Sequence, residues 1–301
     1  MVQAPYLYYH ESPKYYHESL FWRLLVSVAI LMTDQRVKLC KRYPRTRYIY
    51  IYTMNQYILL LLALFHTVAF GTESNPPRWP SSVRIFSPTD TDINSTVQAA
   101  FEINGGHIPS NHGQFSKKRF AFLFKPGSYN VQVPVGYYTQ VLGLGESPDD
   151  VVFTSEMGVF STEGDFTIGG ALSSFWRSAE NFKTMAYHKW YVGTGFMWAV
   201  SQAAPIRRIE IEHDLLLFEY EPPISAAGEA SGGYCANIKI NNGTAKLGSQ
   251  QQWYARDSDF PDWVGGVWNI VTTGVIGAPP TKCDNVNNTT PSTNLPTTPL
   301  M

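Results

Sequence analysis

The arrangement of apolar and polar positions along the chain predicts many short strands. Residues 119–131 read RFAFLFKPGSYNV, and in this stretch a continuous apolar run, 120–124, stops at Pro126-Gly127. Pro fixes φ and Gly accepts positive φ, so the dipeptide indicates a turn. An unbroken apolar run is typical of a strand that is covered on both faces. A short extended stretch, 129–131, follows the turn at once.

One short amphipathic helix is predicted before this run. Asp92 or Asn94 can cap its start, and Gly105-Gly106 ends it. Its apolar residues recur at helical spacing and must be covered by another element. These residues are Ile93, Val97, Ala100 and Phe101.

Beyond the helix, short apolar runs recur and helical signals fade. Four of the runs begin with a tryptophan that is followed by small and polar residues, at Trp176, Trp198, Trp253 and Trp268. Their irregular spacing suits a β-solenoid with loops of varying length, and the segments between them are too short and polar for crossover helices. We therefore expect an all-β fold over residues 79–283, a right-handed parallel β-helix. The short helix would cap its open N-terminal end, where strand edges are unpaired.

The N-terminal region has a different character. Its apolar segment, 57–70, is shorter than the ~20 residues of a membrane span, so 54–71 is predicted to be a signal peptide that is cleaved after Gly71. Residues 1–53 would then be an upstream extension without a role in the mature fold. The alternative is a signal anchor, in which 57–70 would hold the protein in a membrane as a single pass.

Other features agree with secretion. Cys235 and Cys283 form an even pair in an oxidising compartment and are expected to be bridged, whereas Cys40 lies in the extension. Residues 284–301 are rich in Asn, Thr and Pro and are predicted to be a disordered tail. Sequons for N-glycosylation stand at Asn94, Asn242, Asn287 and Asn288.

Composition and motifs exclude several functions. A net charge of −1 with 16% charged residues does not suit a nucleic-acid binder. LGLGESP lacks the third glycine of a dinucleotide fingerprint, so no nucleotide cofactor is expected. His107 and His112 lack further ligands at metal spacing, so no metal site is expected there. Asp257, Asp259 and Asp262 are spaced closely enough to form a calcium site, although an ordinary acidic loop is the favoured interpretation.

Three N-terminal segments resemble a known family. DTDINSTVQAAFEINGG, FLFKPGSYNV and YYTQVLGLGESPDDVVFTS, together covering about 90–155, are similar to the N-terminal signature of pectate-lyase-like right-handed β-helix proteins. FWRSAEN, WAVSQAAP and LGSQQQW resemble secreted microbial β-helix proteins of carbohydrate-active type. The resemblance implies a longer β-helix than this chain holds, and hence a truncated one.

Sugar chemistry requires carboxylates, either as an acid–base pair or as a lyase base beside arginine or calcium. Glu180 and Asp257 are the candidate catalytic residues, with Arg177 and Arg256 beside them to hold an acidic sugar. Both acids stand four residues after a tryptophan, which predicts that they point the same way in stacked strands. The bland alternative is that Arg177–Glu180 and Arg256–Asp257 are solvated surface pairs.

The tryptophans have two interpretations as well. A row of Trp176, Trp198, Trp253 and Trp268 on one face, with Gln202 nearby, would bind a polysaccharide chain. An internal aromatic stack that fills the coil is the alternative. The sequence thus predicts a secreted protein that cleaves extracellular polysaccharide by hydrolysis or as a lyase. Two alternatives remain, a non-catalytic module that binds glycans and a structural cell-surface solenoid.

Overall fold

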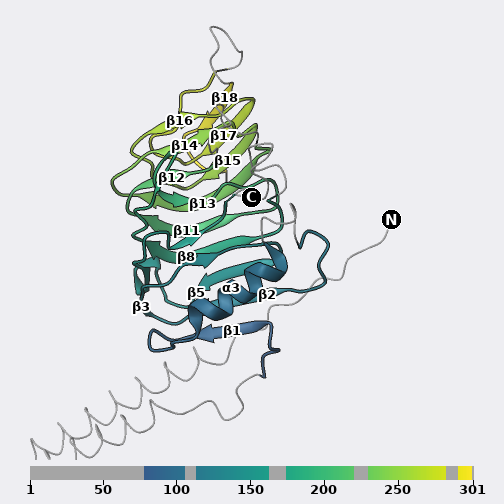
Figure 1. Ribbon diagram of the computed structural model, residues 1–301. Coiled ribbons are helices and arrows are strands. Elements are labelled where there is room, and N and C mark those ends of the chain that lie inside the picture. The colour runs from purple at the N-terminus through teal and green to yellow at the C-terminus, as the bar shows by residue number, and fades with distance from the viewer. Residues whose placement is uncertain (1–77, 106–112, 163–173, 220–229, 283–290, 300–301) are drawn as a thin grey trace, which may run out of the picture. The chain divides into compact units, whose positions relative to one another are not determined.

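The structure is a computed structural model that describes residues 78–105, 113–162, 174–219, 230–282 and 291–299 (Figure 1). The predicted extension and leader, Cys283, and the sequons at Asn287 and Asn288 lie outside these residues. Within the described part, no helix is long and apolar enough to cross a membrane. The fold is all-β, with mostly parallel strands that stack in a solenoid-like column.

The main sheet runs the length of the column in parallel pairs, each strand lying beside the strand of the next turn (Figure 1). Lys125 and Pro126 separate β2 (Phe120–Phe124) from β3 (Gly127–Tyr129). Strand β3 pairs with β6 (Val151–Phe153), which pairs in turn with the second half of β8 (Ser178–Thr184). In order, the main strands are β1 (Val83–Phe86), β2 (Phe120–Phe124), β5 (Thr139–Gly143), β8 (Ser178–Thr184), β11 (Ile206–Ile211), β13 (Gly233–Ile240), β15 (Gln252–Arg256), β17 (Asn269–Thr273) and β18 (Ser292–Leu295). The side strands are β3 (Gly127–Tyr129) and β6 (Val151–Phe153), with a 3-10 turn at Pro148–Asp150.

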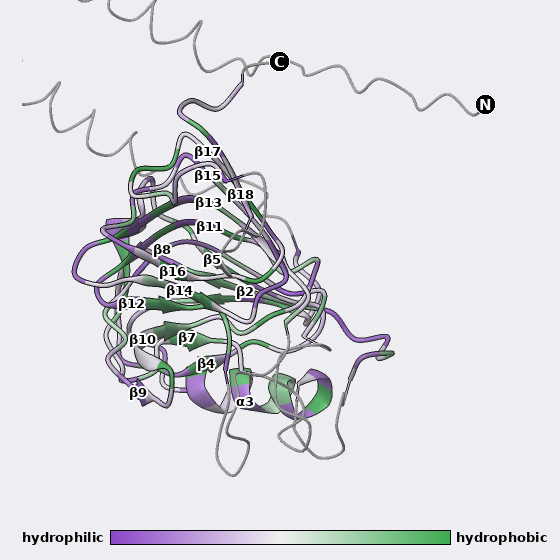
Figure 2. Cartoon of the chain, turned by 90° about the horizontal axis from the view of Figure 1, so that it is seen from above, coloured by the Kyte–Doolittle hydropathy of each residue, from purple (hydrophilic) through white to green (hydrophobic). Residues whose placement is uncertain are grey.

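Shorter strands make a second side of the column. Figure 2 shows them stacked across the interior from the main sheet. They pair in parallel except for the antiparallel pair β9–β10. The strands are β4 (Val133–Pro134), β7 (Val159–Phe160), β9 (Lys189–Trp190), β10 (Gly193–Met197), β12 (Asp214–Leu216), β14 (Ala245–Gly248) and β16 (Trp263–Gly265).

The core lies between the two sides and is aromatic at the N-terminal end. Phe124 is fully buried and contacts the rings of Phe86, Tyr129 and Phe153 at centroid distances of 5.2, 5.0 and 4.9 Å. The ring of Phe153 also contacts that of Phe182, with 5.1 Å between the centroids. Aromatic pairs in such tilted and edge-on geometries add to the stabilisation from burial. The run 120–124 is therefore a strand that buries one face in the interior through Phe122 and Phe124, whereas its other residues are half-buried and the expected cover on both faces is not complete.

The corner after this strand depends on its glycine. Gly127 has a φ of +145°, a conformation that residues with a Cβ rarely adopt. A Cβ there would also collide with the ring of Pro88. The Tyr129 hydroxyl closes the corner by donating to the carbonyls of Phe86 (3.1 Å) and Lys125 (2.7 Å). Burial, followed by the nearby Asp90, raises the pKa of Tyr129 to about 12, so the phenol remains a donor.

The predicted helix is α3 (Ile93–Asn104), and it lies beside β4 (Figure 2). Ile93, Val97 and Ala100 are buried in the core, as their spacing predicts, whereas Phe101 of the same predicted face is only half-buried. Gly105 ends the helix. The expected cap does not form. The Asp92 side chain makes no cap hydrogen bond and instead accepts one from Arg84 Nη2 at 2.8 Å. Asn94 lies within the helix.

The end of the described chain corrects another expectation. Residues 292–295, which the composition assigns to a disordered tail, form β18. This strand pairs in parallel with β17, from Ile270 opposite Ser292 to Thr273 opposite Leu295.

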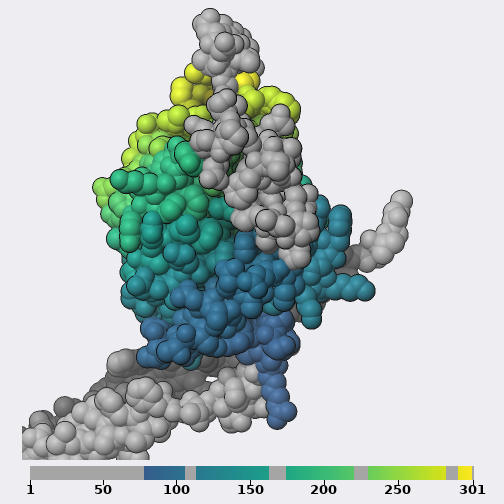
Figure 3. Space-filling model, in the orientation of Figure 1, coloured from purple at the N-terminus to yellow at the C-terminus, as the bar shows by residue number. Residues whose placement is uncertain are grey.

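The turns of the column are stacked in the order of the sequence. The space-filling view shows this as successive bands of colour, from the blue N-terminal turns to the yellow C-terminal ones (Figure 3).

Candidate functional site

A groove follows the edge of the main sheet where its strands begin, and we call it the edge groove. It consists of two adjoining cavities, of about 490 and 610 Å³, that share Ala203 and Pro205. Sites of this size commonly hold small-molecule or sugar ligands. Side chains that line the first cavity include Arg119, Tyr138, Gln140, Trp176 and Ser178. Those of the second include Gln202, Ser231, Tyr234, Gln252, Tyr254 and Asn269.

Aromatic rings are stacked in the first cavity. Tyr138 and Trp176 lie nearly parallel, with 7° between their planes and 5.3 Å between centroids. The Arg119 guanidinium lies 3.6 Å from the centroid of Tyr138, a cation–π contact. Trp176 is 39% exposed, so part of a large flat apolar surface faces solvent beside Gln140 and Ser178.

The backbone at this edge explains why these rings point outward. Residues just before successive strands have positive φ: Tyr138 (55°), Trp176 (52°), Ala203 (59°) and Gly232 (119°). This left-handed conformation costs roughly 1–2 kcal/mol for a residue with a Cβ. Neighbouring turns are bonded to one another here, because Tyr138 N–H donates to the Trp176 carbonyl and Arg177 N–H donates to the Ala203 carbonyl at 3.3 Å. Strain of this kind is often found at functional sites.

The second cavity has the same chemistry in a different arrangement. Tyr234 and Tyr254 are opposite one another in the β13–β15 register, with ring centroids 5.6 Å apart. Gln202 and Ser231 are mutually bonded, Gln202 Nε2 to the Ser231 carbonyl at 2.8 Å and Ser231 Oγ to Gln202 Oε1 at 3.0 Å. Burial raises the pKa of Tyr234, opposed by the positive charges of Arg256 and Arg207. Its hydroxyl is thus a neutral hydrogen-bonding group at physiological pH.

Charged side chains form the next row on the same outer face. In the strand register, Glu180 of β8 lies opposite Arg207 of β11. Arg207 and Arg256 in turn flank Ala236 of β13, one on each side. Glu180 Oε2 accepts from Arg207 Nη2 at 2.6 Å, with the Glu180 side chain 18% exposed. Glu180 is therefore the carboxylate of this face that lies two residues along β8 from Ser178 of the edge groove.

The equal spacing of Glu180 and Asp257 from their tryptophans does not make them equivalent. Arg256, not Asp257, occupies the row of Glu180, and Asp257 follows the end of β15 with a φ of +46°. Its carboxylate accepts from Thr298 Oγ1 at 2.6 Å and from Arg256 Nε at 3.0 Å. The Thr298 bond and Arg256 lower the pKa of Asp257 against a weaker effect of burial. Asp257 thus holds the corner between β15 and the last described segment.

Arg177 is a structural residue rather than a substrate arm, and it does not pair with Glu180. Its side chain is buried and its Nη1 donates to the Val135 carbonyl at 2.6 Å and to Ser161 Oγ at 3.1 Å. The guanidinium lies 4.9 Å from the ring centroid of Tyr137. Burial lowers the pKa of Arg177 to about 10, which still leaves it charged at neutral pH. It ties the start of β8 to the loops that follow β4 and β7.

The four tryptophans divide between the two interpretations. Trp198 and Trp253 are fully buried and fill the interior, so neither offers a face to a sugar. Trp198 follows β10 on the second side of the column, where its Nε1 donates to the Ala204 carbonyl at 2.9 Å. Trp176 lies in the edge groove, and Trp268 is 54% exposed. The expected single row of four exposed rings does not exist.

The expected Cys235–Cys283 disulfide stays a prediction, because Cys283 lies outside the described residues. Among the described residues, Cys235 is a free thiol that is fully buried in the core, where Trp253 Nε1 lies 3.4 Å from its sulfur. Burial raises the pKa of this thiol to about 12, so it remains neutral and unreactive.

The candidate metal and glycan sites lie partly in the region that the structure describes. No group of three acidic, His or Cys side chains there is placed to hold a metal. Of the acids of the proposed calcium loop, Asp257 binds Arg256 and Thr298, and Asp262 Oδ1 accepts from the Trp263 N–H at 2.8 Å. Asn94 and Asn242 are both exposed, and Asn242 Nδ2 donates to Glu212 Oε1 at 2.7 Å.

Four candidate residues of the sequence border the edge groove, Trp176, Arg177, Gln202 and Trp253, of which Arg177 and Trp253 are buried in its wall. The sequence did not indicate most of the other lining residues. Tyr138, Gln140, Tyr234 and Tyr254 occur in YYTQ, GGYC and QWYAR, which carry no motif of a binding site. The available signal was the alternation of directions along a strand: Tyr234 and Tyr254 are each followed by a small buried residue that points inward.

No family model matches the chain. It is 39% identical over 220 residues to an exo-β-1,3-glucanase of Streptomyces sp. (strain SirexAA-E / ActE), a match that covers 73% of this chain and 32% of the relative. It is also similar to the structure of sacteLam55A from Streptomyces sp. SirexAA-E, with a TM-score of 0.62 and 37% identity over 74% of this chain and 36% of that one. The E502A variant of sacteLam55A in complex with glucose gives a TM-score of 0.61 at 36% identity.

These matches correct the family resemblance drawn from the N-terminal motifs. The relatives are an exo-β-1,3-glucanase and the structures of sacteLam55A, not pectate-lyase-like proteins. The stacked parallel strands that the motifs implied are nevertheless present. Motifs such as PGSY and GLG specify corners of the fold, and corners recur in solenoids of unrelated chemistry. The chain spans about a third of the length of these relatives.

Proposed function

We propose that this chain belongs to a glycoside hydrolase 55 protein that hydrolyses β-1,3-glucan, and that the edge groove binds the glucan. The observation that carries the proposal is the parallel Tyr138–Trp176 stack, flanked by Gln140 and Ser178. Flat aromatic faces pack against the apolar faces of sugar rings, while amides and hydroxyls bond the sugar hydroxyls. The similarity to an exo-β-1,3-glucanase supports the choice of glucan.

The same proposal includes the finer architecture. The stacked parallel strands form a right-handed parallel β-helix, and α3 caps its N-terminal end. The support is the register, which continues from β1 to β18 in the main sheet, and the burial of the apolar side of α3 in the same core. Such a column presents a long, rigid outer face, which suits an extended polysaccharide.

Hydrolysis of a glycosidic bond uses two carboxyl groups, about 5–9.5 Å apart depending on the stereochemical outcome. Among the described residues we assign Glu180 as a carboxylate of the reaction, because it stands on the outer face beside the edge groove and is held by Arg207 at 2.6 Å. Asp257 was an equal candidate in the sequence, but its bonds to Arg256 and Thr298 favour a structural role.

The test is glucose release from laminarin, a β-1,3-glucan, by the secreted chain and by Glu180→Gln. We expect the variant to lose more than 100-fold in rate, in the range that acid–base groups contribute. Glu212→Gln is the matched control, since Glu212 is a half-buried glutamate that is bonded by Asn241 and Asn242 beyond the end of β11. It should retain full activity. Equal activity of Glu180→Gln and the control would refute the assignment.

A non-catalytic glycan-binding module is the second candidate. It is favoured by one observation: no carboxylate is among the described residues that line the edge groove itself. Laminarin binding that depends on Trp176, without any glucose release from the intact chain, would select this alternative. Absence of both binding and hydrolysis would overturn the glucan proposal altogether.

We further propose that the protein is secreted, with cleavage after Gly71. The motivation is the short apolar segment 57–70 followed by Ala-x-Gly. Glycosylation at the exposed Asn242 would accompany secretion. N-terminal sequencing of material from the culture medium tests the cleavage, and recovery of the intact N-terminus in the membrane fraction would favour the anchor instead.

A further inference from the structure

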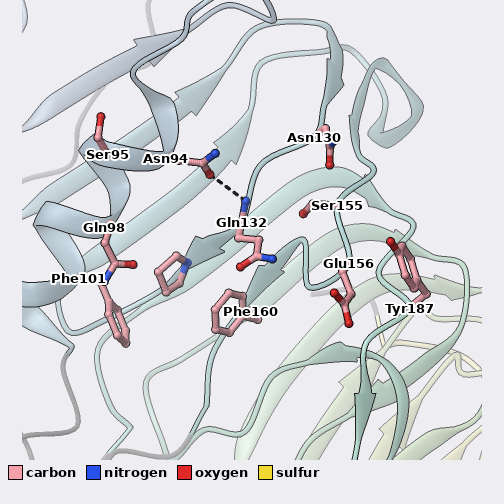
Figure 4. A pocket seen from close by; sticks show the side chains of 11 residues that line it. Asn94, Ser95, Gln98, Phe101, Asn130, Gln132, Ser155, Glu156, Phe160 and Tyr187 are labelled. Atoms are coloured by element: carbon pink, nitrogen blue, oxygen red, sulfur yellow. Dashed lines mark hydrogen bonds between the residues drawn. The ribbon is translucent and has the colours of Figure 1, made fainter.

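A second groove lies on another side of the column, between α3 and the loops that follow β3 and β6. It has a volume of about 750 Å³ and shares no residue with the edge groove. Figure 4 shows Asn94 and Gln98 of α3 on one side, Gln132 in the middle, and Glu156 and Tyr187 on the other. We call it the helix groove. None of its lining residues has a part in the proposed hydrolysis.

The walls of the helix groove are fixed by hydrogen bonds. Gln132 N–H donates to Asn94 Oδ1 at 3.2 Å, which ties the loop after β3 to α3. Ser155, which is buried, donates from Oγ to the Val131 carbonyl at 2.5 Å. The backbone N–H groups of Tyr187 and His188 both donate to the Glu156 carbonyl, at 2.9 and 3.0 Å. A groove that is already held in shape loses little entropy when a ligand binds.

The lining combines an aromatic ring with several neutral polar groups. Tyr187 is 53% exposed, so its ring is open to solvent beside the groove. Four amide side chains line it, and each can donate and accept; they are Asn94, Gln98, Asn130 and Gln132. Glu156 adds a carboxylate, and His188 Nδ1 lies 2.8 Å from its Oε1. Groups of this kind bond hydroxyls that point in many directions, which is the surface that a sugar presents.

The charged side chains of the helix groove indicate which class of ligand it can bind. Among the described residues, those that line the helix groove include one carboxylate and no lysine or arginine. An anionic ligand such as a uronate chain, a phosphate or a nucleic acid would meet Glu156 without a compensating cation. A neutral glycan meets no such penalty. We propose that the helix groove is a separate binding site for a neutral oligosaccharide, which holds a polysaccharide chain to the protein away from the edge groove.

The experiment is calorimetric titration of the intact chain that carries Trp176→Ala, so that binding at the edge groove is weakened and the helix groove is observed alone. The probes are laminarihexaose and cellohexaose, with hexagalacturonate as the charged comparison. We expect one site for a neutral hexasaccharide, and we expect Tyr187→Ala in this background to weaken it by at least about 10-fold, or about 1.4 kcal/mol. Tyr187→Trp should restore binding, because it restores an exposed ring.

The control is Tyr191→Ala. Tyr191 is an exposed tyrosine, 62% accessible, that does not line the groove, so its loss should leave the titration unchanged. Gln98→Ala, on the exposed side of α3, provides a second variant should Tyr187→Ala unfold. The proposal is overturned if neither variant weakens binding, if no neutral hexasaccharide binds to the Trp176→Ala chain, or if hexagalacturonate binds more tightly than both neutral probes. These outcomes do not depend on hydrolysis at the edge groove.

Discussion

The interior of the column and the outer edge of its main sheet each hold a tryptophan with the same kind of sequence around it. Trp253 and Trp176 are both followed by an aromatic or basic residue and then by small and polar residues. Yet Trp253 is 2% exposed and Trp176 is 39% exposed. The comparison teaches that the position of a residue relative to the strand register, rather than its type, decides whether it fills the core or faces a ligand.

The reason for the difference lies in the neighbouring turns. Trp253 is inside β15, directly opposite Gly233 of β13 and Ile270 of β17. A Cβ at Gly233 would collide with the indole ring, so the glycine makes the space that Trp253 occupies. Trp176 lies before β8, in the left-handed conformation that turns the chain, and its ring is directed onto Tyr138.

The largest expected effect comes from emptying the interior. Trp253→Ala should destabilise the protein by about 3–5 kcal/mol, because it removes a buried aromatic ring and leaves a cavity. It also removes the donor to Cys235. Urea unfolding followed by circular dichroism measures the change. A loss below about 1 kcal/mol would show that Trp253 does not fill the core.

Gly233→Ala sharpens the same test. The added methyl group should destabilise the wild-type protein through its collision with the indole ring, by about 1–3 kcal/mol as for overpacked cores. In the Trp253→Ala background the same substitution should cost less, because the ring is absent. Additive effects of the two substitutions would contradict the proposed contact.

The second largest effect on stability is expected at Arg177, a buried cation at the start of β8. Arg177→Met keeps the apolar length of the side chain but removes the donors to the Val135 carbonyl and Ser161 Oγ. Unsatisfied buried groups cost about 1–3 kcal/mol, so the free energy of unfolding should fall by that amount. Arg207→Met, on the exposed surface, is the control and should change it by less than about 1 kcal/mol. Equal effects of the two variants would mean that Arg177 is not a structural tie.

These contrasts also show how far the sequence predicts this molecule. The strand at 120–124, the helical spacing of Ile93 and Val97, and the turn at Gly127 are confirmed, because periodicity and backbone geometry specify such local structure. The expected cover on both faces of 120–124 is not complete, since only Phe122 and Phe124 are buried. Parallel stacking followed from the absence of crossover helices. Such features depend on neighbours in sequence, which a pattern can reveal.

The site was predicted less well because it depends on register between turns. Their equal distance from a tryptophan predicted that Glu180 and Asp257 lie in one row of side chains. In the structure Glu180 lies opposite Arg207, and this row continues through Ala236 to Arg256 instead. Loops of different length separate successive strands, so counting along the chain loses the register at each one. Pairing Arg177 with Glu180 failed for a related reason: residues three apart in a strand point to opposite faces.

The third prediction concerns the ion pair between Lys183 and Glu210 at low pH. Glu210 accepts from Lys183 Nζ at 2.6 Å and from Asn241 Nδ2 at 2.8 Å, and these bonds outweigh burial to lower the pKa of Glu210. A lowered pKa means that the contribution of Glu210 to stability is fully present above its unfolded pKa, near 4.5, and is lost as pH falls through the folded pKa. Glu210→Gln should thus reduce stability by about 1 kcal/mol at pH 7 and have less effect at pH 3. Unfolding curves at both values test this, and Lys183→Met should mimic the loss at pH 7 only.

The smallest change in stability is expected on the outer edge, where the functional effect should be greatest. Trp176→Ala removes a half-exposed ring and should alter the free energy of unfolding by less than about 1 kcal/mol. Trp176→Gly should be at least as stable as Trp176→Ala, because a φ of +52° strains any residue with a Cβ. Both variants lose the ring that stacks on Tyr138 at 5.3 Å, so both should bind laminarihexaose at the edge groove at least about 10-fold more weakly. Stable variants with unchanged affinity would show that the exposed tryptophan is a feature of the turn and not of the site, and would leave the edge groove without its main binding surface.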